Sequence, residues 1–335
     1  MEDRRCVFLY EFVTGGGFLE IDGTPVPDGS LLNEGEAMWR SVYDDLDRVP
    51  DVQVYGLRDS RIEPTRLPNV RSIDGHLREA IFGLAIQCDA TLVIAPEFDG
   101  HLLRSIEAME QFGVRLLGPG SQFVRITSDK TRTAETLASA NVPVPTGGRV
   151  AVGSSLPASF PLPAVLKRND GAGSMAEIVN SIDLADQQNV MRIEHLIPGL
   201  PCSISFFCRG EEKPIACPPM VQILSGGSSL EFGGGRRLLE KKLVARANQL
   251  GRDALAALPD ATGYVGIDLI LGDADDGSGD VVVEVNPRLT TSYIGLREIA
   301  ETNLAEAMLA IAAGREPQIS FSDRDVHFLA DGSIQ

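Results

Sequence analysis

Two carboxylates and one amide interrupt a pair of strongly apolar segments in the last third of the chain. The segment 263–271 contains Asp268, and the segment 281–287 contains Glu284 and Asn286. An acidic, glycine-rich stretch joins them, which predicts a β-hairpin. Glu284 and Asn286 share one face of their strand, and Asp268 joins them if the register brings it to the same side. Oxygen ligands of this kind suit Mg²⁺, so we predict a site for one or two Mg²⁺ ions, with Mn²⁺ as an alternative.

The same residues allow two other interpretations. The polar side chains could line the exposed face of an ordinary hairpin, but isolated carboxylates in apolar strands are costly unless they are paired or bind metal. Asp273, Asp275 and Glu284 also match positions 1, 3 and 12 of an EF-hand loop. That loop requires a glycine where this chain has Ser278, and it lies between helices, whereas the flanks here are strand-like. A calcium loop is therefore disfavoured.

Two lysines and a glycine-rich segment have the chemistry of a phosphate-binding site. Lys167 ends a short apolar strand and is followed by Gly171, Gly173 and Ser174, whose backbone N–H groups can surround phosphate oxygens. Lys130 lies in the first turn of a predicted helix, where the helix dipole disfavours a cation unless an anion is bound nearby. Most such glycine-rich segments are plain turns, and the chain contains neither a Walker motif nor a dinucleotide-binding fingerprint.

Strands and helices alternate in the first third of the chain. Strand-like segments occur at 7–13, 52–57 and 90–96, and helical spacing occurs near 34–48, 75–87 and 101–111. This alternation predicts one open α/β domain at 1–120, with a parallel sheet covered on both faces. From Pro201 onward we expect a mostly antiparallel region with one long helix, whose apolar stripe runs from Leu239 to Leu258.

Composition and charge limit the classes of function. The chain of 335 residues is 43% apolar and 23% charged, as expected for a globular protein of two or three domains. Its formal net charge of −17 argues against nucleic-acid and anionic-membrane partners, which need basic surfaces. No apolar segment is long enough to span a membrane, and the five cysteines lack disulfide or zinc spacing. We therefore expect a cytoplasmic protein with reduced thiols, either monomeric or homo-oligomeric.

The order and spacing of these residues resemble the ATP-grasp superfamily. The matching set, within 115–300, is Asp129-Lys130, Lys167 with Gly171-Ala172-Gly173-Ser174, Glu194 before Pro198-Gly199, Asp268, and Glu284-Val285-Asn286-Pro287-Arg288. Residues 284–292, together with Tyr10-Glu11-Phe12 and Ala95-Pro96-Glu97, further resemble the tyramine–glutamate ligase branch of methanofuran biosynthesis. The implied fold combines α/β and α+β classes: a pre-ATP-grasp domain at 1–120, a small lid subdomain with the glycine-rich loop at 121–199, and a larger antiparallel-sheet subdomain with the metal ligands at 200–335.

The resemblance implies where a nucleotide binds. ATP would lie between the lid and the larger subdomain, with Lys130, Lys167 and the glycine-rich loop on its phosphates. Backbone groups from Glu194 to Leu196 would contact the adenine, and Glu194 would accept a hydrogen bond from its amino group. Many members place a ribose-binding acidic residue about seven positions after that glutamate, where this chain has Pro201. Ribose contacts must therefore come from elsewhere.

The resemblance also implies the chemistry. Asp268, Glu284 and Asn286 would hold the metal, and Arg288 would face the transferred phosphate and the substrate carboxylate. Transfer of the γ-phosphoryl group converts a carboxylate, which is a poor electrophile, into an acyl phosphate that an amine can displace. Arg288 and Lys167 are the candidate catalytic residues, because phosphoryl transfer needs positive charge and positioning more than covalent help.

The narrower resemblance implies L-glutamate as the carboxylate donor and tyramine or tyrosine as the amine acceptor. Two alternatives stay open: an ATP-grasp ligase that makes another dipeptide or glutamyl product, and an ATP-binding regulatory protein without turnover. The complete set of Asp268, Glu284, Asn286 and Arg288 argues against the second, because a site that has lost turnover need not keep its metal ligands.

Overall fold

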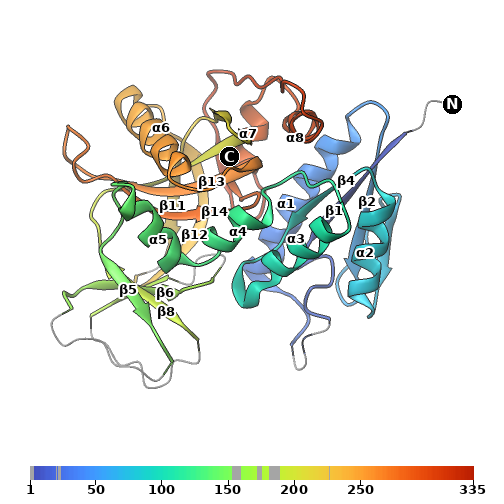
Figure 1. The fold of residues 1–335 in the computed structure, drawn as a ribbon, viewed down its shortest axis with the longest axis horizontal. Helices are drawn as coiled ribbons and strands as arrows, with labels where there is room; N and C mark the ends of the chain where they lie inside the picture. Colours follow the sequence, from blue (N-terminus) through green and yellow to red (C-terminus); the bar gives the residue numbers. More distant parts are fainter. Residues whose placement is uncertain are drawn as a thin grey trace.

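The computed structural model describes residues 4–19, 21, 24–152, 160–171, 176–180, 189–225 and 227–335. Within these ranges the strands form a four-stranded sheet and a larger, mostly antiparallel sheet (Figure 1). No helix in the described ranges is both long enough and apolar enough to cross a membrane. The Gly173 and Ser174 predictions lie outside the described residues.

The N-terminal sheet is parallel, as its alternating pattern predicts. Its strands are β1 (Arg5–Glu11), β2 (Val52–Asp59), β3 (Val70–Ile73) and β4 (Ala90–Ile94), in the order β3-β2-β1-β4. The covering helices are α1 (Gly29–Asp47), α2 (Leu77–Gln87) and α3 (His101–Gln111). Side chains alternate between the faces of β1, so Val7 and Leu9 pack with α1, whereas Phe8 and Tyr10 pack with α2 and α3. Both faces of the sheet are therefore buried.

The larger sheet joins a small set of strands to the strands that carry the acidic hairpin. The small set is β5 (Gly147–Val150), β6 (Ala164–Arg168), β7 (Ala176–Val179) and β8 (Met191–His195). The others are β9 (Leu200–Arg209), β10 (Glu212–Ala216), β11 (Met220–Ser225), β12 (Ser229–Arg237), β13 (Thr262–Leu271), β14 (Val281–Asn286) and β15 (His327–Leu329). The main order is β14-β13-β9-β11-β12-β7-β6-β8-β5, in which β12 connects the two sets through its pairing with β7.

The remaining helices position the lysine-bearing segment and cover the large sheet. They are α4 (Ser121–Thr127), α5 (Lys130–Ser139), α6 (Lys241–Ala256), α7 (Ser292–Ile299) and α8 (Leu304–Ala312). The sequence pattern around Thr127-Ser128-Asp129-Lys130 predicts Thr127 or Ser128 as the cap of the helix with Lys130, and this prediction is wrong. Asp129 caps α5, since its carboxylate accepts a hydrogen bond from the backbone of Arg132, while Thr127 ends the preceding helix.

The apolar stripe of α6 is shorter than the sequence pattern predicts. The helix begins at Lys241, so Leu239 lies before it and its side chain is 55% exposed, and Leu258 is buried beyond its end. Between them, Ala247, Leu250 and Ala254 are buried against the large sheet, as expected. The stripe continues past the end of the helix, because Leu258 packs against the same core, but it does not extend before the helix to Leu239.

A buried carboxylate joins the N-terminal sheet domain to the rest of the molecule. Asp45 of α1 accepts hydrogen bonds from the hydroxyl of Tyr293 at 2.8 Å and from the guanidinium of Arg297 at 2.6 and 3.0 Å, both on α7. The side-chain amide of Asn303 donates to the backbone carbonyl of Asp45 at 2.7 Å. This network fixes α1 against α7, and so fixes the N-terminal sheet relative to the acidic hairpin.

Candidate active site

The predicted hairpin exists, and its register brings the three oxygen-bearing side chains together. β13 and β14 are antiparallel, with Asp268 directly opposite Glu284 and Gly266 opposite Asn286. Residues directly opposite each other lie on the same face of a sheet. The amide of Asn286 donates a hydrogen bond to Oδ2 of Asp268 at 3.1 Å. The strands on both sides exclude the EF-hand alternative, since that loop requires flanking helices.

Asp268 is held in place from two sides and is crowded by a second negative charge. Gln222 of β11 donates to its Oδ1 at 2.8 Å, while Asn286 occupies its Oδ2. Burial, followed by the charge of Glu284, raises the pKa of Asp268 to about 6. Two partly buried carboxylates side by side favour a cation between them. The donor set therefore fits a hard divalent ion.

The three oxygen-bearing side chains at the hairpin are two carboxylates and one amide, so they do not make up a cluster of three acidic, histidine or cysteine ligands. No group of three His, Cys, Asp or Glu side chains in the described part of the chain is arranged to hold a metal ion. Magnesium commonly takes one or two protein carboxylates and completes its shell with water and phosphate oxygens. Two carboxylates and one amide are compatible with this pattern, in which water and phosphate oxygens complete the metal shell.

Lys130 lies beside the hairpin, as the position of its helix suggests. Its Nζ is 2.5 Å from Oε1 of Glu284 and donates to the backbone carbonyl of Gly171 at 2.6 Å. The ammonium group thus lies between a candidate metal ligand and the start of the glycine-rich segment. Lys130 and Glu284 form an ion pair, so an anion with a bound divalent cation could contact both residues at once. The anion would meet Lys130 and the cation would meet Glu284.

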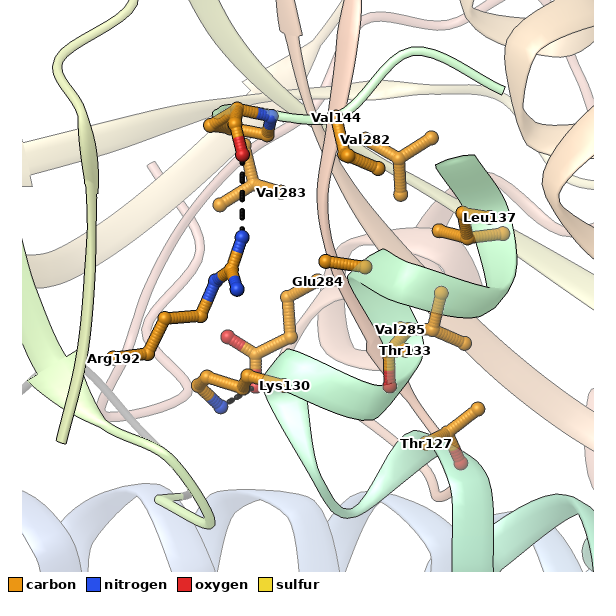
Figure 2. A pocket seen from close by; sticks show the side chains of 12 residues that line it. Thr127, Lys130, Thr133, Leu137, Val144, Arg192, Val282, Val283, Glu284 and Val285 are labelled. Carbon is orange, nitrogen blue, oxygen red and sulfur yellow. Dashed lines mark hydrogen bonds and ion pairs between the residues drawn. The ribbon is translucent and has the colours of Figure 1, made fainter. Parts of the chain in front are cut away.

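Figure 2 shows the pocket next to this pair, enclosed by α5 and β14 and by Arg192 from β8. Apolar side chains of Leu137, Val144 and Val282 line one side of it. Lys130 and Glu284 lie at its opposite end, joined by their ion pair. The pocket therefore has an apolar wall and a polar end. It lies between β8 of the small strand set and β14 of the acidic hairpin.

Lys167 and Glu194 are brought together, but Glu194 is more fully occupied than predicted. Nζ of Lys167 is 2.5 Å from Oε1 of Glu194, and Nε of Arg192 donates to Oε2 at 2.9 Å. All three side chains are buried. Both carboxylate oxygens therefore already have cationic partners, so a hydrogen bond to an adenine amino group would need a shared oxygen or the neighbouring backbone.

The other residues predicted to contact a nucleotide follow directly on β8. His195 ends the strand, and its ring packs edge-on against Phe160 with 5.3 Å between ring centroids. Leu196 comes next, and its side chain is 37% exposed.

Arg288 connects the hairpin to the N-terminal sheet. Its Nε donates to Oε1 of Glu97 at 2.9 Å, and a second guanidinium nitrogen lies 3.4 Å from Oε2. Both side chains are largely buried. Arg288 follows β14 and Glu97 follows β4, so this bidentate pair spans the boundary between the two sheets.

Three residues of this site had no assigned role in the sequence analysis. Gln222 holds Asp268, Arg192 holds Glu194, and Glu97 holds Arg288. Gln222 and Arg192 could have been found as polar residues inside apolar strands. Glu97 was recognised only as part of a family-like segment, because nothing in its local pattern indicates a partner far along the chain.

Comparison with known proteins gives matches over most of the chain. Residues 127–292 match the model described as ATP-grasp domain, and residues 52–124 match the model described as pre ATP-grasp 3 domain. The tyramine–L-glutamate ligase of Methanocaldococcus jannaschii is 23% identical over 98% of this chain and 95% of that protein. The enzyme of the same name from Methanocaldococcus fervens is 23% identical over 92% of this chain and 95% of that protein.

A solved structure has a similar overall fold. An ATP-grasp superfamily protein from Archaeoglobus fulgidus superposes with a TM-score of 0.73 at 21% identity, covering 97% of this chain and 92% of that one. At this identity the likeness concerns the fold. It agrees with the arrangement described above, in which a parallel N-terminal sheet is followed by a large, mostly antiparallel sheet.

Proposed function

This chain belongs to the ATP-grasp superfamily and is an ADP-forming carboxylate–amine ligase, and we propose that it joins L-glutamate to tyramine or tyrosine through an acyl phosphate. The observation that carries the proposal is the convergence of Asp268, Glu284 and Asn286 beside Lys130. Sites of phosphoryl transfer need this combination of metal ligands and a fixed cation. We also propose a cytoplasmic location, since five unpaired cysteines suit a reducing compartment.

We assign the nucleotide phosphates to the space between Lys130 and Lys167. Lys130 already contacts Glu284 and the carbonyl of Gly171, so its charge lies where a phosphate that shares the metal would lie. Lys167 is fixed by Glu194 on the neighbouring strand. Asp268, Glu284 and Asn286 would hold Mg²⁺, which supplies positive charge to the phosphate oxygens and orients them.

The adenine is assigned to the apolar pocket and to the segment after β8. The exposed Leu196 side chain lies there, while the backbone N–H of His195 already donates to the carbonyl of Thr146 at 2.8 Å, so a backbone contact to the adenine would come from Leu196, as the family resemblance implies. Since both oxygens of Glu194 are held by Lys167 and Arg192, we propose that its main role is to orient Lys167. The hydrogen bond from the adenine amino group to Glu194 would then be a secondary contact, made to a carboxylate oxygen that Lys167 or Arg192 also contacts.

Arg288 completes the reaction centre. A substrate carboxylate bound to its guanidinium would lie next to the hairpin, where the transferred phosphoryl group arrives. Positive charge from Arg288 and Lys167 stabilises the negative charge on the transferring group. Attack by the neutral amine on the acyl carbon then forms the carbon–nitrogen bond and breaks the carbon–oxygen bond to phosphate. Inorganic phosphate leaves with the bonding pair, and the nitrogen releases one proton to solvent. No step requires a covalent nucleophile from the protein.

The choice of substrates rests on the two Methanocaldococcus relatives, which match over nearly the whole chain. The test is ADP release from Mg²⁺-ATP in the presence of L-glutamate, with tyramine or tyrosine added in turn, followed by mass analysis of the products. ADP release that depends on the amine, with a product mass equal to the condensed amide, is the expected result. ADP release only with another carboxylate or amine would keep the ligase and discard these substrates. Tight ATP binding without turnover for any pair would favour the regulatory alternative.

A further inference from the structure

Two glutamates lie at the carboxyl ends of β1 and β4, and a third glutamate, on α1, lies close enough to Arg288 for the guanidinium charge to act on it. Glu11 ends β1, Glu97 follows β4, and Glu34 lies on α1, where the adjacent Gly35 packs directly against the Glu11 carboxylate. After β1 the chain enters α1 on one face of the sheet, whereas α3, which follows β4, covers the other face. Ligands of open parallel sheets bind where connections diverge in this way, at the carboxyl ends of the strands.

The pair between Glu97 and Arg288 restricts what can bind to Arg288. Both charges are largely buried, and each is the other's ion-pair partner. Taking one partner away from a buried ion pair leaves an uncompensated charge, which is strongly unfavourable. A substrate carboxylate therefore binds Arg288 more strongly when it arrives together with a positive group that can take over Glu97.

Glu34 is the carboxylate with unused hydrogen-bonding capacity. Glu11 is satisfied, since it accepts from the backbone N–H groups of Val13 and Thr14 and from the Thr14 hydroxyl. By contrast, no donor in the described part of the chain reaches the half-buried Glu34 side chain. Burial raises the pKa of Glu34 to about 7, and the positive charge of Arg288 limits the rise. A partly desolvated carboxylate without a donor is costly unless a ligand supplies one.

We propose that Glu97 and Glu34 bind the ammonium group of a substrate while Arg288 binds the carboxylate that reacts. The inference rests on the proposed ligase function and names the charge that its substrates must carry. The ammonium group belongs either to the α-carbon of the donor or to the acceptor amine, which then passes one proton to Glu34 or Glu97 before its nitrogen attacks the acyl carbon. In both cases two ion pairs replace the single pair between Arg288 and Glu97. Arg288 pairs with the substrate carboxylate and Glu97 pairs with the ammonium group, so that no buried charge loses its partner.

The variant that tests the proposal is Glu34→Gln, which keeps the shape of the side chain and removes its charge. Glu97→Gln is a second variant, because it also alters the partner of Arg288. Asp44→Asn is the matched control, since Asp44 is an exposed carboxylate on the same helix. Each protein is assayed for product and ADP with three substrate pairs: L-glutamate with tyramine, L-glutamate with hydroxylamine, and glutarate with hydroxylamine. Hydroxylamine is mostly uncharged near pH 7.5, and glutarate lacks the α-ammonium group.

The pattern of losses identifies the source of the ammonium group. If it comes from the acceptor, Glu34→Gln lowers kcat/KM about 10- to 100-fold with tyramine and leaves both hydroxylamine reactions unchanged. If it comes from the donor, both glutamate reactions fall by that factor and the glutarate reaction does not. Equal losses in all three reactions, or no loss in any, would overturn the proposal. The KM for ATP should stay constant throughout.

A failure of the substrate assignment gives a different result from a failure of this inference. If wild-type protein makes no product from glutamate, the donor that supports ADP release and its deaminated analogue replace glutamate and glutarate, and the same comparison decides. If no donor supports ADP release, the ligase function and this inference fail together. An active ligase whose preference for ammonium-bearing substrates is unchanged in both variants contradicts the inference alone.

Discussion

Asp268 and Glu284, both carboxylates, lie directly opposite each other on adjacent strands. Like charges in this position destabilise a sheet. The arrangement is tolerated because Lys130 pairs with Glu284, while Gln222 and Asn286 donate to Asp268. A register shift follows Asp268 on β13, which is typical of strands that present a side chain at a functional site. The fold thus holds two negative charges close together at the cost of local stability.

Gln222→Ala should weaken the response of the enzyme to Mg²⁺ without abolishing ATP binding. Removing a residue that orients a metal ligand typically costs about 10- to 100-fold in metal affinity or activity. A titration of ADP release against Mg²⁺ concentration measures this, and half-saturation should move to higher concentration. Gln249→Ala is the control, because Gln249 lies on the exposed face of α6 and its side-chain amide donates to Asp253. An unchanged Mg²⁺ titration in Gln222→Ala would remove the support for Asp268 as a metal ligand.

Lys167→Gln should weaken ATP binding while the fold persists. The change removes a buried charge that faces the proposed phosphates and leaves Glu194 paired with Arg192. We expect the ATP dissociation constant to rise about 10- to 100-fold, as for other charge-assisted contacts. Equilibrium binding of a non-hydrolysable ATP analogue measures this without requiring turnover. Lys242→Gln serves as the control, since Lys242 pairs with Asp275 on the exposed hairpin loop; equal affinities in the two variants would place the phosphates elsewhere.

Asp45→Asn should destabilise the whole chain, not only one domain. Asp45 is buried and accepts from both Tyr293 and Arg297, so the change leaves the Arg297 charge without its main partner. Breaking a buried pair in this way typically costs about 3–5 kcal/mol. Denaturant unfolding at pH 7.5 measures the loss. Asp44→Asn on the same helix, where the side chain is exposed, should change the unfolding free energy by less than about 0.5 kcal/mol.

The stability of Glu34→Gln, compared with that of the wild-type protein, should increase as pH rises. The folded-state pKa of Glu34, about 7, lies above its ordinary value of 4.5, so the folded protein keeps a proton that the unfolded chain releases. The stability linked to this proton is present below pH 4.5 and is lost as pH rises through about 7. The difference in unfolding free energy between Glu34→Gln and wild type should therefore grow by about 1–2 kcal/mol between pH 5 and pH 8, after allowance for partial exposure.

The same titration should appear in substrate binding. Only ionised Glu34 attracts an ammonium group, so the KM of the ammonium-bearing substrate should fall as pH rises through about 7 in the wild-type enzyme. In Glu34→Gln this dependence should be absent. Arg288 is the charged group whose field acts on Glu34. Its guanidinium stays charged over this range, so it does not contribute a competing titration.

The sequence by itself determined the kinds of element and the chemistry of the hairpin. Alternating apolar residues around Asp268 and Glu284 specified two strands, and the acidic stretch between them specified the turn. Glu284 and Asn286 had to share a face, because strand geometry repeats every two residues. The parallel N-terminal sheet followed in the same way from strands alternating with helices. All of these patterns are short-range. Each one selects among the few conformations that the backbone allows, so a short segment is enough to specify the element.

Only the tertiary structure decided which side chains meet. Lys130 and Glu284 are 154 residues apart, and Arg288 and Glu97 are 191 residues apart. Local spacing carries no information on such pairs, because they depend on how whole sheets pack through α1 and α7. The register that puts Asp268 opposite Glu284 is likewise fixed by the buried face of β13 and by its pairing with β9 and β14. Burial then sets the charges, since the desolvation that raises the pKa of Asp268 and Glu34 exists only once the two sheets enclose them.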